Sequence, residues 1–218
     1  MRKRTATYLK VGVGLLGLIV LLWNTVFAEF VPRSRTELAP NAVSLTLAVD
    51  KPTYTPDEFP SLCATLTNNS KETILVAIAQ DGSDRGRAPS CLFEITYPMD
   101  TPEPEPIGIC GNTNPITAEV FQTVSPGQSI DVWPRGIPLA LMQQIKRGPG
   151  KYTATMTYST YSENIDVWLG GPLRQSAEAI LRLKIQPLVN RVPLFSVTSN
   201  SVSFEILNPP EAALSHDS

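Results

Sequence analysis

Apolar and polar residues alternate along much of the chain, and this alternation predicts β-strands. In residues 43–49 every second position is apolar, which is the period-two pattern of a strand with one buried face. Alternating segments or short apolar runs predict further strands at residues 62–66, 73–79, 93–97, 152–158, 181–185 and 202–206, separated by Pro, Gly, Asn and Ser clusters. We therefore expect an all-β fold, an antiparallel β-sandwich over residues 43–208.

One segment has helical spacing instead. Leu139, Met142 and Ile145 recur every three residues after Pro138 and before Gly148. A proline at the first turn and a glycine after the last turn are typical helix boundaries. The pattern predicts one short surface helix over residues 138–146.

The first 28 residues predict an export signal or a membrane anchor. Residues 1–10 carry four cations and no acid, and the next 18 residues, 11–28, carry no charge. The strongly apolar part, residues 11–23, has the length of a cleaved signal, and Val26 and Ala28 suit cleavage after Ala28. The whole uncharged run also reaches the lower limit for a membrane-spanning helix. Both alternatives stay open, a signal peptide or an N-terminal signal anchor helix that crosses the membrane through residues 8–28.

Either alternative places the rest of the chain outside the cytoplasm, in the cell envelope or secreted. Residues 29–42 contain two prolines and no periodicity, and we expect a tether there. Without residues 1–28, the chain carries 14 Lys and Arg against 20 Asp and Glu. This acidic balance argues against nucleic acid as a partner.

Three cysteines allow one disulfide in an oxidising compartment. If residues 91–97 and 104–110 form a hairpin, pairing Tyr97 with Pro104 places Cys91 opposite Cys110. Opposed residues of an antiparallel pair lie within disulfide range. We predict the bridge Cys91–Cys110, and Cys63 is then the thiol that no bridge uses; we expect it to be inert because no cation adjoins it in sequence.

Candidate chemistry is sparse and indicates a protein that is not an enzyme. Residues 209–218 form a tail after the last expected strand, and its Ser215, His216 and Asp217 are adjacent in sequence, so they cannot align as nucleophile, base and orienting group. Asp81 and Asp84 lie in one turn, but two carboxylates are too few for calcium, and turn chemistry is the favoured interpretation. We expect no catalytic residue, no metal and no cofactor.

Four residues are candidates for contact with a protein partner. Trp133 and Trp168 lie in segments that read as loops, and tryptophan is enriched in binding hot spots. Alternatively they cover an end of the core, which the apolar neighbours of Trp168 favour. Pro102 and Glu103 lie at a tip stiffened by prolines. These features favour a non-catalytic binding or structural module.

Three motifs carry a resemblance to a known family: VDKPTYTPDE at residues 49–58, SPGQS at 125–129 and PGKYTA at 149–154. Over residues 43–158 their order resembles bacterial exported immunoglobulin-like domains, in particular the BsuPI-type proteinase-inhibitor sandwich. The chain departs from that pattern at Asp57, where those domains usually have glycine. The resemblance implies that the expected sandwich over residues 43–208 has an immunoglobulin-like topology. It also suggests an alternative function, proteinase inhibition through an exposed loop, with residues 98–106 as the candidate loop.

Overall fold

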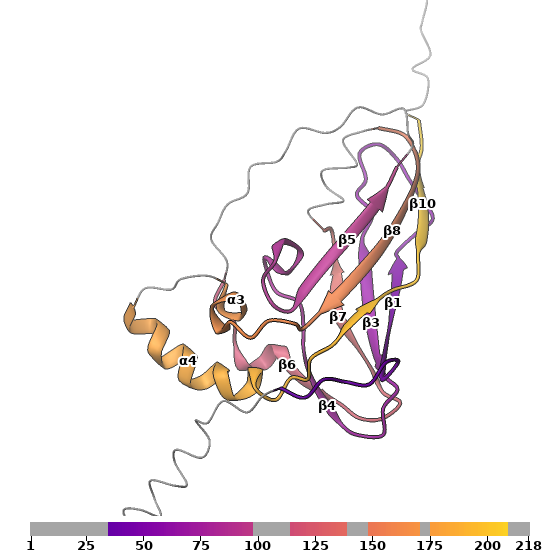
Figure 1. Ribbon diagram of the computed structural model, residues 1–218. Coiled ribbons are helices and arrows are strands. Elements are labelled where there is room, and N and C mark those ends of the chain that lie inside the picture. The colour runs from indigo at the N-terminus through magenta and orange to yellow at the C-terminus, as the bar shows by residue number, and fades with distance from the viewer. Residues whose placement is uncertain (1–34, 98–113, 139–147, 171–174, 209–218) are drawn as a thin grey trace, which may run out of the picture. The chain divides into compact units, whose positions relative to one another are not determined.

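The computed structural model describes residues 35–97, 114–138, 148–170 and 175–208 (Figure 1). Several expectations lie outside these residues: the leader 1–28, the surface helix after its first residue, the tip with Pro102, Glu103 and Cys110, and the tail 209–218. Within the described ranges, no helix has the length and apolar character needed to cross a membrane.

Strands dominate the described residues, and nearly all of them pair antiparallel. They are β1 (Val43–Val49), β2 (Thr53–Tyr54), β3 (Leu62–Asn68), β4 (Ile74–Ala77), β5 (Ser90–Thr96), β6 (Phe121–Val124), β7 (Ser129–Gly136), β8 (Gly150–Ser159), β9 (Ser196–Thr198) and β10 (Val202–Ile206). The helices are the short η1 (Ser83–Arg85) and η2 (Ala118–Val120), and α3 (Ile165–Leu169) and α4 (Gln175–Val189). The expected all-β class is therefore confirmed.

The strands form three sheets. One has the order β1-β3-β7, the second has the order β2-β10-β8-β5 with β9 also paired to β8, and the third is the pair β4-β6. The β10–β2 pairing is parallel, whereas the other strand pairs are antiparallel. In the β1–β3 register Leu45 lies opposite Leu66, and Leu47 lies opposite Ala64. This register puts the apolar sets of both strands on one face.

A single core joins the two larger sheets. Alternate residues of β8 are buried, as its sequence pattern predicts, and they meet buried residues of β1, β3, β4 and β10. Aromatic rings fill one part of this core, where Phe204 stacks on Tyr152 with centroids 5.5 Å apart and meets Tyr54 edge-on at 5.9 Å. Such pairs add stabilisation beyond the burial of their area.

The VDKPTYTPDE motif forms a tight corner between β1 and β3. The Tyr54 hydroxyl donates to Asp50 Oδ1 at 2.6 Å, and the same oxygen accepts the main-chain N–H of Ser61 at 2.8 Å. Lys51 Nζ lies 4.9 Å from the centroid of the Tyr54 ring and pairs with Glu58 at 2.5 Å. Asp50, Lys51 and Glu58 of this corner are therefore engaged in contacts within the chain.

A second core lies beside the first and contains the helices. Its buried members come from β4, β6, α3, α4 and the segments next to them: Leu75, Ala77, Ala88, Ile116, Phe121, Ile165, Trp168, Leu169, Ile185, Val189 and Val192. The strand expected over residues 181–185 is wrong, because these residues lie in α4. Ile185 and Val189 are buried at helical spacing, whereas Leu183, which a strand would have buried with Leu181 and Ile185, is exposed.

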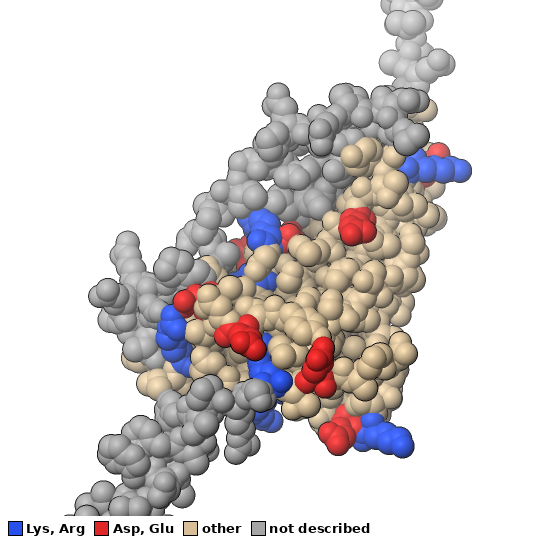
Figure 2. Space-filling model, in the orientation of Figure 1, with Lys and Arg blue, Asp and Glu red and all other residues tan. Residues whose placement is uncertain are grey.

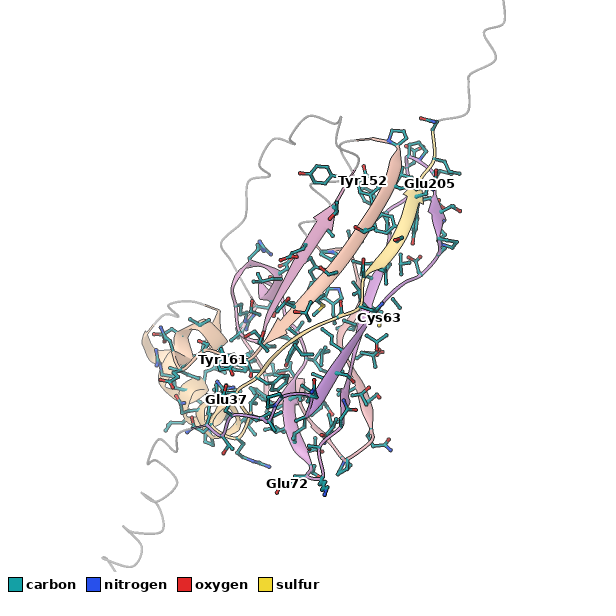
Figure 3. All side chains as sticks on the ribbon, turned by 45° about the vertical axis from the view of Figure 1, so that its right-hand side comes forward. Glu37, Cys63, Glu72, Tyr152, Tyr161 and Glu205 are labelled. Atoms are coloured by element: carbon teal, nitrogen blue, oxygen red, sulfur yellow. The ribbon has the colours of Figure 1, made fainter. Side chains whose placement is uncertain are left out.

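The segment before β1 is hydrogen-bonded to the segments that precede α3 and follow α4. Arg35 donates three hydrogen bonds to main-chain oxygens, from Nε to Val192 at 2.7 Å, from Nη1 to Ser162 at 2.8 Å and from Nη2 to Pro193 at 3.3 Å. Nearby, the Tyr161 hydroxyl donates to Glu37 (Figure 3). Residues 35–42 of the expected tether therefore pack on the domain.

Charges of both signs are exposed on one face of the described residues. Figure 2 shows acidic and basic side chains interspersed on that face.

Candidate binding site at Trp133

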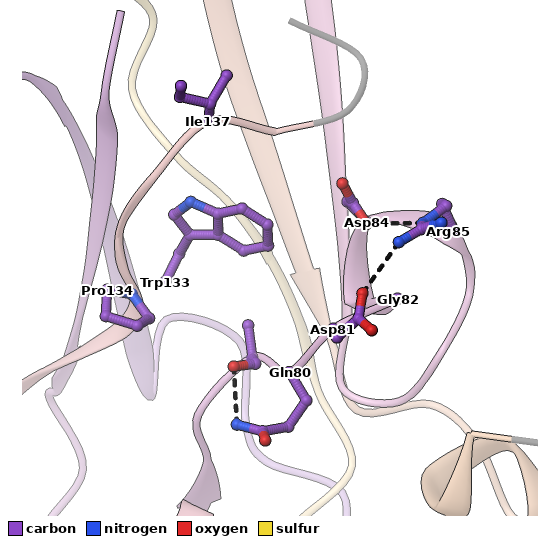
Figure 4. Close-up of a pocket in the computed structure, with 9 residues that line it drawn as sticks. Gln80, Asp81, Gly82, Asp84, Arg85, Trp133, Pro134 and Ile137 are labelled. Atoms are coloured by element: carbon purple, nitrogen blue, oxygen red, sulfur yellow. Dashed lines mark hydrogen bonds and ion pairs between the residues drawn. The ribbon is translucent and has the colours of Figure 1, made fainter. Parts of the chain in front are cut away.

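A cavity of about 280 Å³ lies between the turn that follows β4 and the end of β7 (Figure 4). We call it the Trp133 pocket. Its lining consists of Ala79, Gln80, Asp81, Gly82, Asp84, Arg85, Trp133, Pro134 and Ile137. One wall is apolar and the other is charged, and the two come from segments about fifty residues apart in sequence.

Two irregularities in β7 set the position of Trp133. The β3–β7 register shifts on either side of the pair Ala64–Trp133, so β7 carries extra residues between Asp131 and Gly136. Such bulges re-aim side chains and end regular pairing. Val132 is fully buried in the main core, while Trp133 is half-buried at its edge.

The indole of Trp133 is held by an aromatic contact. Its ring meets Phe93 of β5 edge-on, with centroids 5.0 Å apart and an interplanar angle of 69°. The indole Nε1 is buried and has no hydrogen-bond partner. A buried donor without a partner costs roughly 1–3 kcal/mol, so the position is not optimised for stability alone.

The opposite wall is a compact turn that two glycines make feasible. Gly82 and Gly86 have φ of 87° and 99°, in the left-handed region that favours glycine. Within this turn Arg85 pairs with Asp81 at 3.0 Å and with Asp84 at 3.4 Å. The guanidinium therefore balances the charge of the two carboxylates within the turn. Among the described residues, no three acidic, His or Cys side chains form a group able to hold a metal.

Arg87 connects the turn to α3 through hydrogen bonds. It is buried, and it donates from Nη1 to the Asp81 main-chain oxygen at 3.0 Å and from Nε to the Trp168 main-chain oxygen at 3.2 Å. Burial lowers the pKa of Arg87, while the negative charge of Asp81 opposes that shift. The turn is thereby connected to α3, and the charged wall of the pocket has a rigid support.

The other expected site residues lie elsewhere. Trp168 is fully buried in the second core, stacked on Phe121 at 6.2 Å and donating from Nε1 to the Ser162 oxygen at 3.0 Å. Its burial agrees with the alternative in which it covers an end of the core, and it offers a partner no exposed surface. Cys63 is half-buried on β3. Cys91 is buried on β5, and burial raises the pKa of its thiol; its expected bridge to Cys110 lies outside the described residues.

The described lining of the pocket combines an indole with two carboxylates, and both carboxylates face a guanidinium. Its volume lies at the lower limit of small-molecule pockets, which start at about 300 Å³, so it has room for a single side chain. No family model matches the chain, and no curated protein matches it.

The sequence singles out Trp133 as a candidate but does not indicate which residues lie opposite it. Asp81, Gly82 and Asp84 predict a turn. Its position across from Trp133 depends on the pairing of β3 with β7 and of β5 with β8, which local patterns do not specify.

Proposed function

We propose that this protein is a non-catalytic, extracytoplasmic binding module with an immunoglobulin-like β-sandwich fold, and that its Trp133 pocket receives an apolar side chain of a protein partner. The single observation that carries the proposal is the half-buried indole of Trp133, set between Pro134 and Ile137 and faced by the Asp81–Arg85 ion pair. Hot spots have this composition: an aromatic anchor in a pocket, with a polar rim that excludes water.

Two features support the sandwich and the binding role. The two larger sheets contribute to one core, as the layers of a sandwich do. Loops at the ends of such sandwiches vary without disturbing the core, and the Trp133 pocket is built from turn and strand-end residues of this kind. The resemblance to exported immunoglobulin-like domains also favours this scaffold.

The inhibitor alternative has no structural observation in its favour, because residues 98–106 lie outside the described ranges. The extracytoplasmic location is supported by the cations of residues 1–10 and the uncharged run of residues 11–28. Mass spectrometry of the native N-terminus tests it: a chain that starts at Glu29 is a released protein, and an intact start with membrane retention after a carbonate wash is an anchored protein. An intact start in the soluble fraction contradicts both forms of the leader.

A displayed peptide library tests the binding role. The full chain is panned against short peptides that carry Leu, Phe or Met, or else Asp or Lys, at a fixed central position. We expect enrichment of peptides with apolar centres, and Trp133→Ala should weaken their binding by about tenfold or more, the scale of a hot-spot truncation. The matched control is Leu92→Ala, on an exposed residue of β5 outside the pocket, which should leave binding unchanged. Peptides whose binding survives Trp133→Ala would contradict the site.

A further inference from the structure

One face of α4 carries apolar side chains that the described part of the domain leaves exposed. Ile180 and Leu183 have 60% and 56% of their area exposed, the largest fractions among the large apolar side chains of the described residues. They lie three positions apart, so they are neighbours on one helix face. Lys184 and Pro187, both exposed, continue that face at the next helical positions.

The other face of α4 is well packed. Ile185 and Val189 are buried in the second core, and Leu181 and Leu188 are half-buried against it. The exposed side chains are therefore not the result of a loosely docked helix. An amphipathic helix usually presents polar residues outward, so two large apolar residues there need a partner.

An uncharged run precedes the domain in sequence, and only a short segment separates the two. Residues 11–28 carry no charge, and only residues 29–34 separate them from Arg35. Arg35 is bound to the main-chain oxygens of Val192 and Pro193, just after α4 ends at Val189. An extended chain from Ala28 to Arg35 spans at most about 25 Å. The 15 residues of α4 span about 22 Å, so a linker of this length is comparable to the helix itself and keeps α4 near any bilayer that holds residues 11–28.

We propose that the exposed face of α4 docks on the lipid bilayer in which residues 11–28 are anchored, with Ile180 and Leu183 at the boundary between headgroups and acyl chains. This inference rests on the anchored form in the proposed function. Two apolar side chains bind a membrane weakly on their own. The short tether makes the contact intramolecular and so raises the effective concentration of lipid at this face. Lys184, with its flexible stem, keeps its charge at the level of the phosphates.

Photo-crosslinking to lipid tests the docking. The full chain is reconstituted into nanodiscs of phosphatidylethanolamine and phosphatidylglycerol, with a photoreactive amino acid at position 183, and adducts are identified by mass spectrometry. The control carries the same residue at position 92, where Leu92 is 52% exposed on β5. We expect several-fold more phospholipid adducts at position 183 than at position 92.

A variant pair makes the test specific to α4. With the probe at position 187, Ile180→Glu combined with Leu183→Glu should lower lipid adducts several-fold, because two charges must then enter the interface. Both side chains are exposed, so the far-UV circular dichroism spectrum should not change.

Equal adducts at positions 183 and 92, in protein that stays in the nanodisc, would overturn the docking and leave the anchor intact. Crosslinks from position 183 to a second copy of the chain would overturn it in favour of a dimer. Loss of the protein from the membrane fraction would overturn the anchor, and the docking with it.

Discussion

The hydroxyl of Tyr158 on β8 donates a hydrogen bond to the main-chain oxygen of Ala77 on β4, over 2.7 Å and with both residues fully buried. This bond connects the larger mixed sheet to the β4–β6 pair, and therefore the main core to the second core. The ring of Tyr158 also stacks on Phe195, with centroids 5.6 Å apart. Tyr158 thus contributes both a buried hydrogen bond and aromatic packing where the two cores meet.

Tyr158→Phe should lower the free energy of unfolding by about 1–2 kcal/mol, because it removes a buried hydrogen bond while keeping the ring. Urea unfolding of the full chain in detergent solution measures this change. The matched control is Tyr161→Phe: Tyr161 is exposed, and its hydroxyl donates to Glu37, so its loss should cost no more than a few tenths of a kcal/mol. Equal effects of the two substitutions would contradict the role of the buried bond.

The same tyrosine predicts a loss of stability in alkali. Burial raises the pKa of Tyr158 in the folded protein, and burial together with the hydrogen bond to Asp50 raises that of Tyr54. A raised pKa means that the folded state holds its proton at a pH where the unfolded state has released it. The corresponding stability is complete below about pH 10, the ordinary tyrosine pKa, and is lost as the pH rises above it. Unfolding curves at neutral and alkaline pH should show this decline, and Tyr158→Phe should make it shallower. A decline of the same steepness in the variant would assign it to other groups.

Arg35→Lys should loosen the segment before β1. Lysine cannot reproduce the fork that reaches three main-chain oxygens, nor the stacking of the guanidinium over Trp168 at 5.2 Å. The Leu38 amide, bonded to the Leu194 oxygen at 3.0 Å, should then exchange its hydrogen roughly tenfold faster. Hydrogen-exchange mass spectrometry measures this rate. Arg191→Lys, on an exposed arginine, serves as the control and should leave the rate unchanged.

The predicted Cys91–Cys110 bridge is tested by peptide mapping without reduction. We expect a linked pair of peptides that contain Cys91 and Cys110, and Cys91→Ser should lower the free energy of unfolding by about 2–5 kcal/mol. A linked peptide that contains Cys63, or three reduced thiols in protein from the oxidising compartment, would show the predicted pairing to be wrong. Because burial raises the pKa of the Cys91 thiol, that thiol in reduced folded protein should resist alkylation at neutral pH.

Local periodicity of the sequence is sufficient to predict strands that have one buried face. In β1 and β8 each buried residue alternates with a more exposed one, so a pattern of period two carries the structure directly. It was insufficient for β7, where bulges, Pro134 and Gly136 interrupt the alternation. The bulges that place Trp133 beside the pocket also break the alternation, so the sequence pattern does not predict β7.

The α4 segment shows where two periods compete. Leu181, Leu183 and Ile185 alternate like a strand, while Leu181, Ile185, Leu188 and Val189 recur like a helix. Only contact with the second core distinguishes them, since the buried set is the helical one and Leu183 remains outside. A short apolar-rich segment is ambiguous by periodicity alone.

The sequence alone determined the strand-rich class, most of the strand positions and the uncharged run before the domain, because each depends on residues close together in the chain. Tertiary structure decided which strands pair, that Trp168 is buried, that Arg85 pairs with both Asp81 and Asp84, and that the charged turn faces Trp133. These features depend on contacts between distant segments, whose geometry follows from the packing of two cores and the bulges of β7. Side-chain alternation specifies which face of a strand is buried, and only the assembled sheets specify what that face meets.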